Sequence, residues 1–141
     1  MRIISYLIFV LACFLMSKIN AGELKINVTN IKNDIGSIHY ALYNSPEKFP
    51  DSNGALLGGN KDVEKVLIDG LTISNLKESL YAIAIYHDEN SNNQFDTFFS
   101  IPTERYGFSN DAPVFLGPPN FDDASIFIPR DKTVQIEIKL R

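Results

Sequence analysis

Alternation of apolar and polar residues runs through the first and last segments of the chain beyond residue 21. In residues 23–29, and again in 133–141, every second side chain is apolar. A period of two places one face of a strand in a core and the other in water. Residues 37–43 alternate in the same way after a turn at 33–36. We therefore expect 23–29 and 37–43 to pair as an antiparallel hairpin, and 133–141 to be the last strand.

The middle of the chain contains one strongly apolar segment and several weaker ones. Residues 80–87 are apolar on both faces, which predicts a central strand covered from both sides. Residues 45–60 are rich in Pro, Gly, Asn and Ser, which is typical of a loop, and 60–67 has room for one helical turn. Shorter strands are expected at 63–68, 71–73 and 124–128. About seven strands in about 120 residues predict an all-β fold, a two-sheet antiparallel β-sandwich with one long ordered loop capping an end.

That long loop is residues 88–123. Loops beyond about 15 residues are uncommon in compact domains unless they are functional or disordered. This one contains six of the ten Phe residues of the chain and four of its seven Pro residues, which argues against a solvated segment. It also carries seven Asp and Glu against one Arg, a net charge of 1 - 7 = -6. We expect it to fold as a packed acidic lid over one end of the sandwich.

The first nine residues of the loop have the spacing of a calcium-binding loop of the EF-hand type. A tight loop turns alternate side chains toward its centre, and Ca²⁺ prefers oxygen ligands. The positions that fit are 1, 3, 5 and 9, with a backbone carbonyl at position 7. The candidate metal ligands are therefore Asp88, Asn90, Asn92, the carbonyl of Gln94, and Asp96.

Two positions depart from the calcium pattern. Asn93 occupies position 6, where glycine is expected, although Asn tolerates a positive φ better than most residues. Phe99 occupies position 12, where a bidentate Glu would complete the shell. Further ligands would then be water or a later carboxylate: Glu104, Asp111, Asp122 or Asp123. With two carboxylates in the run we expect a dissociation constant of about 0.1 to 1 mM. The alternatives are an Asx-rich turn without a metal, or another ion or polar ligand.

Signals for catalysis are sparse. The chain has no Gly-x-Ser-x-Gly or His-Glu-x-x-His motif, and its two histidines are His39 and His87. His87 is followed by Asp88, but neighbours on a strand point to opposite faces, so we assign no catalytic residue and expect no enzyme. The alternative is a small periplasmic hydrolase or carbohydrate-active enzyme that uses two loop carboxylates, such as Glu104 with Asp111 or Asp122. A third option is a carbohydrate or protein ligand bound by the Tyr and Phe side chains of 88–123.

The first 21 residues have the layout of a secretory signal peptide: Arg2, an apolar run at 3–16, and a polar stretch ending at Ala21. About fourteen apolar residues are too few to span a bilayer as a helix, so we expect no membrane anchor after processing. Cleavage after Ala21 would leave 22–141 as a single domain, in the periplasm or outside the cell, with a formal charge of 11 - 17 = -6. A lipoprotein acylated at Cys13 is the alternative. Without a basic cluster, nucleic acid is not an expected partner.

Three stretches of the chain carry a family resemblance. LKESLYAIAIYHDENSNNQFD at 76–96, FFSIPTERYGFSNDAP at 98–113 and GPPNFDDASIFI at 117–128 resemble the bacterial domain of unknown function family 2141, a set of small exported proteins. The resemblance implies a β-sandwich similar to transthyretin-like and carboxypeptidase-regulatory-like modules. Members typically have Gly-x-Gly where this chain has Ser91-Asn92-Asn93, and Gly where it has Ser100. The resemblance implies no reaction, so the calcium prediction depends on the spacing.

Overall fold

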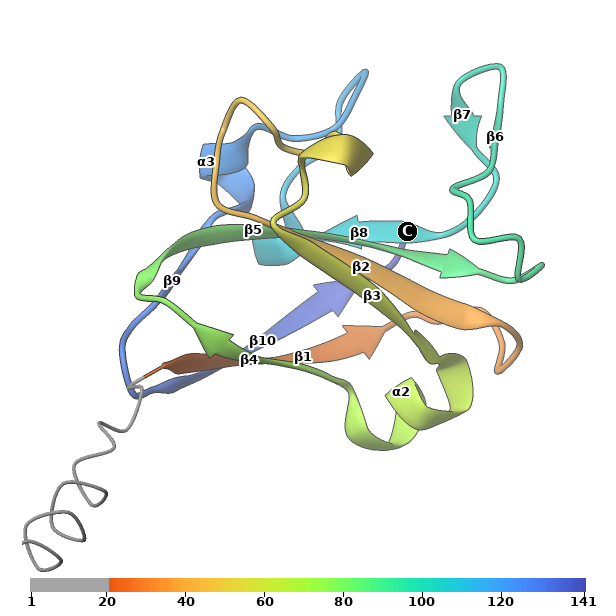
Figure 1. Cartoon of the computed structure of the whole chain (residues 1–141). Coiled ribbons are helices and arrows are strands. Elements are labelled where there is room, and N and C mark those ends of the chain that lie inside the picture. Colours follow the sequence, from red (N-terminus) through yellow and green to blue (C-terminus); the bar gives the residue numbers. More distant parts are fainter. Residues whose placement is uncertain (1–20) are drawn as a thin grey trace, which may run out of the picture.

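The computed structural model describes residues 21–141 as two packed β-sheets with a layer of loops on one of them (Figure 1). The predicted signal peptide, including Cys13, lies outside the described residues except for Ala21. Within 21–141, none of the helices has the length and apolar character needed to cross a bilayer. The all-β sandwich predicted from periodicity is confirmed.

The first sheet has the strand order β10-β1-β4. β1 (Gly22–Thr29) pairs in parallel with β10 (Thr133–Lys139) and antiparallel with β4 (Leu71–Leu76). The sandwich is therefore not purely antiparallel. Both ends of the described chain meet in this sheet because the apolar faces of β1 and β10 bury together, with Leu24, Ile26 and Ile138 almost fully inaccessible.

The second sheet has the order β3-β2-β5-β8, with β9 pairing to the start of β5. Its strands are β2 (Ser37–Tyr43), β3 (Leu57–Asp62), β5 (Ser79–Asp88), β8 (Tyr106–Phe108) and β9 (Ile126–Ile128). The predicted hairpin is wrong, because β1 and β2 lie in different sheets. The chain crosses from one sheet to the other between them, with Asn30 at φ 60 and Gly36 at φ 79 making the two turns.

The central position predicted for 80–87 is confirmed, because β5 is buried on both faces. Its inner face, with Tyr81, Ile83 and Ile85, joins the main core between the sheets. Its outer face contributes Ala82 to a second cluster, which Phe49, η2 (Ser109–Asp111) and α3 (Phe121–Ala124) cover. Sheet, core, sheet and loop layer thus stack in that order, with η1 (Ser52–Gly54) also in the outer layer (Figure 1).

Ser109 hydrogen-bonds to backbone groups that have no strand partner in the second sheet. β5 pairs with β9 over residues 79–81 and with β8 over 84–86, so Ile83 has no strand partner on that side. The buried Ser109 hydroxyl accepts the Ile83 N–H at 2.9 Å and donates to the carbonyl of Ala124. One side chain thereby satisfies two buried backbone groups where β5 changes neighbours.

Two predictions for the segment between β2 and β4 are wrong. Residues 63–68 were expected as a strand but form the helix α2 (Val63–Asp69), with Val63 and Val66 buried and Ile68 exposed. Buried residues three positions apart lie on one face of a helix. The helical turn expected within 60–67 overlaps α2, so the helix was predicted in part. Residues 45–60 were expected to be loop, yet β3 begins at Leu57, because its glycines still hydrogen-bond to β2.

The long segment 88–123 is only partly the packed lid that was expected. Its β8, η2 and α3 join the sandwich, and Phe108 and Phe121 are buried. The two-stranded ribbon of β6 (Thr97–Phe98) and β7 (Ile101–Pro102) instead stands away from the sheet (Figure 1). Five large apolar side chains of this segment are strongly exposed instead of packed: Phe98, Phe99, Ile101, Phe115 and Leu116.

Candidate functional site

A row of very small residues crosses the outer face of the second sheet. Gly58 on β3 is paired with Ala41 on β2, and Ala41 is paired with Ala84 on β5. Alternation along each strand places these three residues on the same face of the sheet, so no large side chain rises from it there. The α3 layer covers the neighbouring part of this face but leaves the row open. The result is a trough across three strands.

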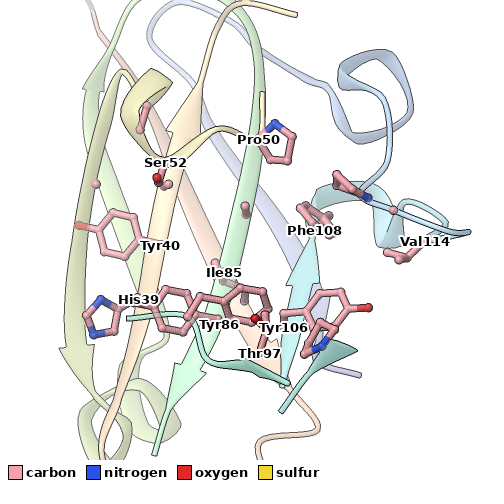
Figure 2. Close-up of a pocket in the computed structure, with 18 of the residues that line it drawn as sticks. His39, Tyr40, Pro50, Ser52, Ile85, Tyr86, Thr97, Tyr106, Phe108 and Val114 are labelled. Atoms are coloured by element: carbon pink, nitrogen blue, oxygen red, sulfur yellow. The ribbon is translucent and has the colours of Figure 1, made fainter. Parts of the chain in front are cut away.

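A row of aromatic rings borders the trough, two residues further along each strand on the same face of the sheet. His39, Tyr86 and Tyr106 are cross-strand neighbours on β2, β5 and β8. The His39 and Tyr86 rings are stacked, with centroids 4.7 Å apart and planes at 19°. Phe95 packs on the same row, with its ring centroid 5.3 Å from Tyr86 and 5.7 Å from Tyr106. Figure 2 shows the His39, Tyr86 and Tyr106 side chains side by side along one edge of the hollow.

The trough and its borders enclose a groove of about 1090 Å³. The 95–102 ribbon segment forms one wall, with Phe95, Phe99 and Ile101. The opposite wall comes from the outer layer, with Pro50 and Ser52 near η1 and the loop at 114–118 (Figure 2). Small-molecule sites typically occupy 300 to 1,000 Å³, so the groove is large enough for one.

Of the residues that the structure describes, no Lys, Arg, Asp or Glu side chain lines this groove. Its one titratable base, His39, is held neutral because burial lowers its pKa, against the opposing effect of the nearby Asp88 carboxylate. Burial, and then the charges of Asp88, Glu104 and Asp96, raise the pKa of the Tyr86 hydroxyl. At neutral pH the groove therefore presents aromatic faces and a few uncharged polar groups.

The predicted calcium loop, residues 88–96, leads directly into the ribbon wall, and Asp88 is its buried first residue. The Asp88 side chain is 0% exposed. Its carboxylate accepts the backbone N–H groups of Asn92, at 3.2 Å, and Asn93, at 2.9 Å. The Nε2 atom of His39 lies 3.2 Å from Asp88 Oδ2. No histidine partner of Asp88 is evident from the sequence. His39 is its diagonal neighbour on β2, far away in the chain, and His87, next in the chain, lies on the opposite face of β5.

Of the other predicted ligands, the side chains of Asn90, Asn92 and Asp96 lie together. Asn90 and Asn92 each donate a side-chain N–H to the Asp96 carboxylate, at 2.7 Å and 3.0 Å. Asn93 has a φ of 61°, as expected for the residue in the glycine position of the pattern. The side-chain oxygen of Asn92 accepts the N–H of Gln94, and that of Asn90 accepts the N–H of Asn92. These hydrogen bonds are the ones expected of an Asx-rich turn.

Asp96 connects this loop to the ribbon wall. Its carbonyl accepts the Thr103 N–H at 3.0 Å, which closes the base of the ribbon. Its own N–H donates to Glu104 Oε2 at 3.0 Å. These two hydrogen bonds join the 88–96 loop to the wall that carries Phe95 and Phe99.

A family model for "Uncharacterized protein conserved in bacteria (DUF2141)" matches residues 26–137. The chain belongs to the DUF2141 family. The match covers both sheets, the groove and the acidic loop, and confirms the resemblance drawn from residues 76–128. Comparison with curated proteins and with solved structures found no match.

Among residues 21–141 of this DUF2141 chain, Glu104 is the one buried carboxylate besides Asp88. It is 7% exposed, and its Oε1 atom is buried without a hydrogen-bond partner. Burial raises the pKa of Glu104, and the charges of Asp96 and Asp88 raise it further, while the Asp96 N–H opposes them. In the sequence Glu104 was one of four optional ligands, and only its position beside Asp96 in the fold distinguishes it from the others.

The carboxylates of the enzyme alternative lie apart from the groove. Asp111 forms an ion pair with Arg141, and Asp122 is exposed in the first turn of α3. Neither of them, nor Glu104, lines the groove. In residues 21–141 no cluster of three or more His, Cys, Asp or Glu side chains is arranged to hold a metal ion. The predicted calcium site, with two carboxylates and otherwise amide and carbonyl oxygens, stays a prediction, as do the expected lack of enzyme activity and its hydrolase alternative.

Proposed function

We propose that this DUF2141 protein is an exported binding module whose ligand lies in the groove on the outer face of the second sheet. The observation that carries the proposal is the open Gly58–Ala41–Ala84 row beside a row of aromatic rings. Elsewhere the same face is covered by Phe49, Phe121 and their neighbours. Aromatic surface left open in a concave site, next to surface that is covered, is typical of a binding site.

The test is a ligand screen read against a variant that fills the trough. Ala84→Phe places a ring where the sheet now carries a methyl group, and Ile68→Ser, at an exposed position on α2, is the control. Neutral apolar compounds, oligosaccharides and short peptides are screened by ligand-observed NMR. We expect at least one class to bind in a way that Ala84→Phe abolishes and Ile68→Ser preserves. A screen in which every hit is unaffected by Ala84→Phe would contradict the proposal.

Export is the second part of the proposal and is supported by the signal-peptide pattern of 1–21. Mass spectrometry of the protein from an expression host would test it. The expected mature chain begins at Gly22. A chain beginning at an acylated Cys13 would identify a lipoprotein, and an uncleaved chain that stays in the cytoplasm would contradict export.

A calcium ion at 88–96 is a second candidate function, favoured by the convergence of Asn90, Asn92 and Asp96 and by the free Oε1 of Glu104 beside them. A cation there would bind to the oxygens of Asp96 in place of two amide N–H groups. It would also offset the charge that Asp88, Asp96 and Glu104 concentrate in one place. Because Asp96 closes the base of the ribbon, calcium would stiffen one wall of the groove.

Thermal melts with calcium against a chelator test this second candidate. For a dissociation constant of about 0.1 to 1 mM, about 5 mM calcium stabilises the folded protein by roughly 1 to 2 kcal/mol. Asp96→Asn should abolish the shift, whereas Asp123→Asn, at an exposed position on α3, should leave it unchanged. Equal melting temperatures with calcium and with chelator would show that the loop is a metal-free Asx turn.

A further inference from the structure

We infer that the ligand of this groove is a neutral, predominantly apolar small molecule, an inference that rests on the proposed binding function. The lining of the groove excludes charged ligands first. An ion that enters must lose water, and this is unfavourable unless a charged partner replaces it. None of the lining side chains is Lys, Arg, Asp or Glu. An anion would also approach an 88–123 segment of formal charge -6, obtained as 1 - 7.

The polar groups of the groove are too few for a strongly hydroxylated ligand. The uncharged polar side chains of its lining are Ser52, Asn60, Thr97 and Ser100, with the hydroxyls of the tyrosines and the ring of His39. The remaining surface is aromatic, aliphatic, alanine, glycine or proline. Sugar hydroxyls that are buried without hydrogen-bond partners weaken binding. The composition of the lining therefore favours an apolar ligand over an oligosaccharide.

The two rims of the groove give an independent argument. Phe99, at the tip of the ribbon, is 86% exposed, and Leu116, on the opposite rim, is 96% exposed. Both residues have a positive φ, 47° and 55°, a conformation that is uncommon for residues other than Gly, Asn and Asp. A ligand that fills the groove would bury both side chains from opposite sides. The driving force of that burial is hydrophobic, which again requires an apolar ligand.

The experiment uses the full chain expressed with its own leader and purified after processing by the host. N-phenyl-1-naphthylamine, a neutral apolar fluorophore, is the probe, because its emission rises in an apolar site. Three competitors separate the ligand classes: 1-dodecanol is neutral and apolar, dodecanoate has the same chain with a charge, and maltotetraose is neutral and hydroxylated. Competition is measured at neutral pH, and binding of maltotetraose is also measured directly by calorimetry.

We expect the probe to bind and dodecanol to displace it, with dodecanoate weaker by about tenfold or more and maltotetraose without effect. Ala84→Phe should weaken probe binding by at least about tenfold, and so should the surface changes Phe99→Ser and Leu116→Ser, which do not touch the core. Ile68→Ser removes an apolar side chain that is 81% exposed but lies away from the groove, and should have no effect.

The outcomes that overturn the inference are distinct from those that overturn the proposed function. Binding of maltotetraose that Ala84→Phe abolishes, without binding of the probe, means that the groove is a binding site for another ligand class. Equal displacement by dodecanoate and dodecanol contradicts neutrality. Absence of probe binding, or binding that neither Ala84→Phe nor the two rim variants weaken, overturns the inference. If in addition no compound of the wider screen depends on Ala84, the proposed function fails as well.

Discussion

Asp88 is predicted to hold the 88–96 loop to the sheet whether or not a metal is present. The Asp88→Ala variant removes the acceptor of two backbone N–H groups, those of Asn92 and Asn93, and the neighbour of His39. A hydrogen bond to a charged group contributes roughly 1.5 to 3 kcal/mol, and the two together contribute roughly 3 to 6 kcal/mol. Part of that is offset because the buried carboxylate no longer has to be desolvated. We expect a net loss of roughly 3 kcal/mol, a large share of the 5 to 15 kcal/mol of a typical domain.

The assay is urea unfolding in the presence of a chelator at neutral pH, with the free energy extrapolated to water. Asp88→Asn keeps the shape and one acceptor, so its loss should be intermediate. Asp34→Ala removes an exposed carboxylate from the turn before β2, and should change the stability by less than about 0.5 kcal/mol. A loss below about 1 kcal/mol for Asp88→Ala would refute the view that its buried hydrogen bonds organise the loop.

Three further predictions address the scaffold around the site. Ser109→Ala leaves the buried Ile83 N–H and a carbonyl without partners and should destabilise by roughly 2 to 4 kcal/mol in urea unfolding, whereas Ser125→Ala should have a much smaller effect. Glu104→Gln, in chelator, should stabilise: because the folded-state pKa of Glu104 is raised above 4.5, its charge destabilises the fold at neutral pH, and the gain should shrink as the pH falls toward 4.5. Equal stability at neutral pH would contradict this. Gly36→Ala should impair folding, because a Cβ there would lie 2.0 Å from the Asp88 carbonyl oxygen at a φ of 79°; a wild-type melting temperature would contradict it.

The strands that alternate cleanly could be predicted from the sequence, and their partners could not. Alternation identified β1, β2 and β10, and a segment apolar on both faces identified β5, but the same apolar faces are satisfied by a hairpin or by two facing sheets. Local periodicity does not distinguish these arrangements. β3 was missed because Gly58 and Gly59 are poor strand formers, and its stability comes from pairing with β2.

The same distinction holds for the two candidate sites. The 88–96 loop is local, so spacing alone predicted that Asn90, Asn92 and Asp96 converge and that Asn93 takes a positive φ. The groove is not local. Its floor consists of Ala41 and Ala84, each ordinary in its own strand, and they form a trough only because the register of β2 and β5 places them opposite each other. In the sequence, the one sign of the groove was an outward-facing alanine among aromatic residues.

The central claim is that ligand occupies the groove over Ala41 and Ala84. The most direct test is to follow the alanine methyl resonances by NMR while N-phenyl-1-naphthylamine is added. The methyl groups of Ala41 and Ala84 should shift, because aromatic ring currents act within a few ångströms. Those of Ala112 and Ala124, which are buried within the outer layer, should stay in place. Probe binding that leaves the methyl resonances of Ala41 and Ala84 unmoved would contradict the claim.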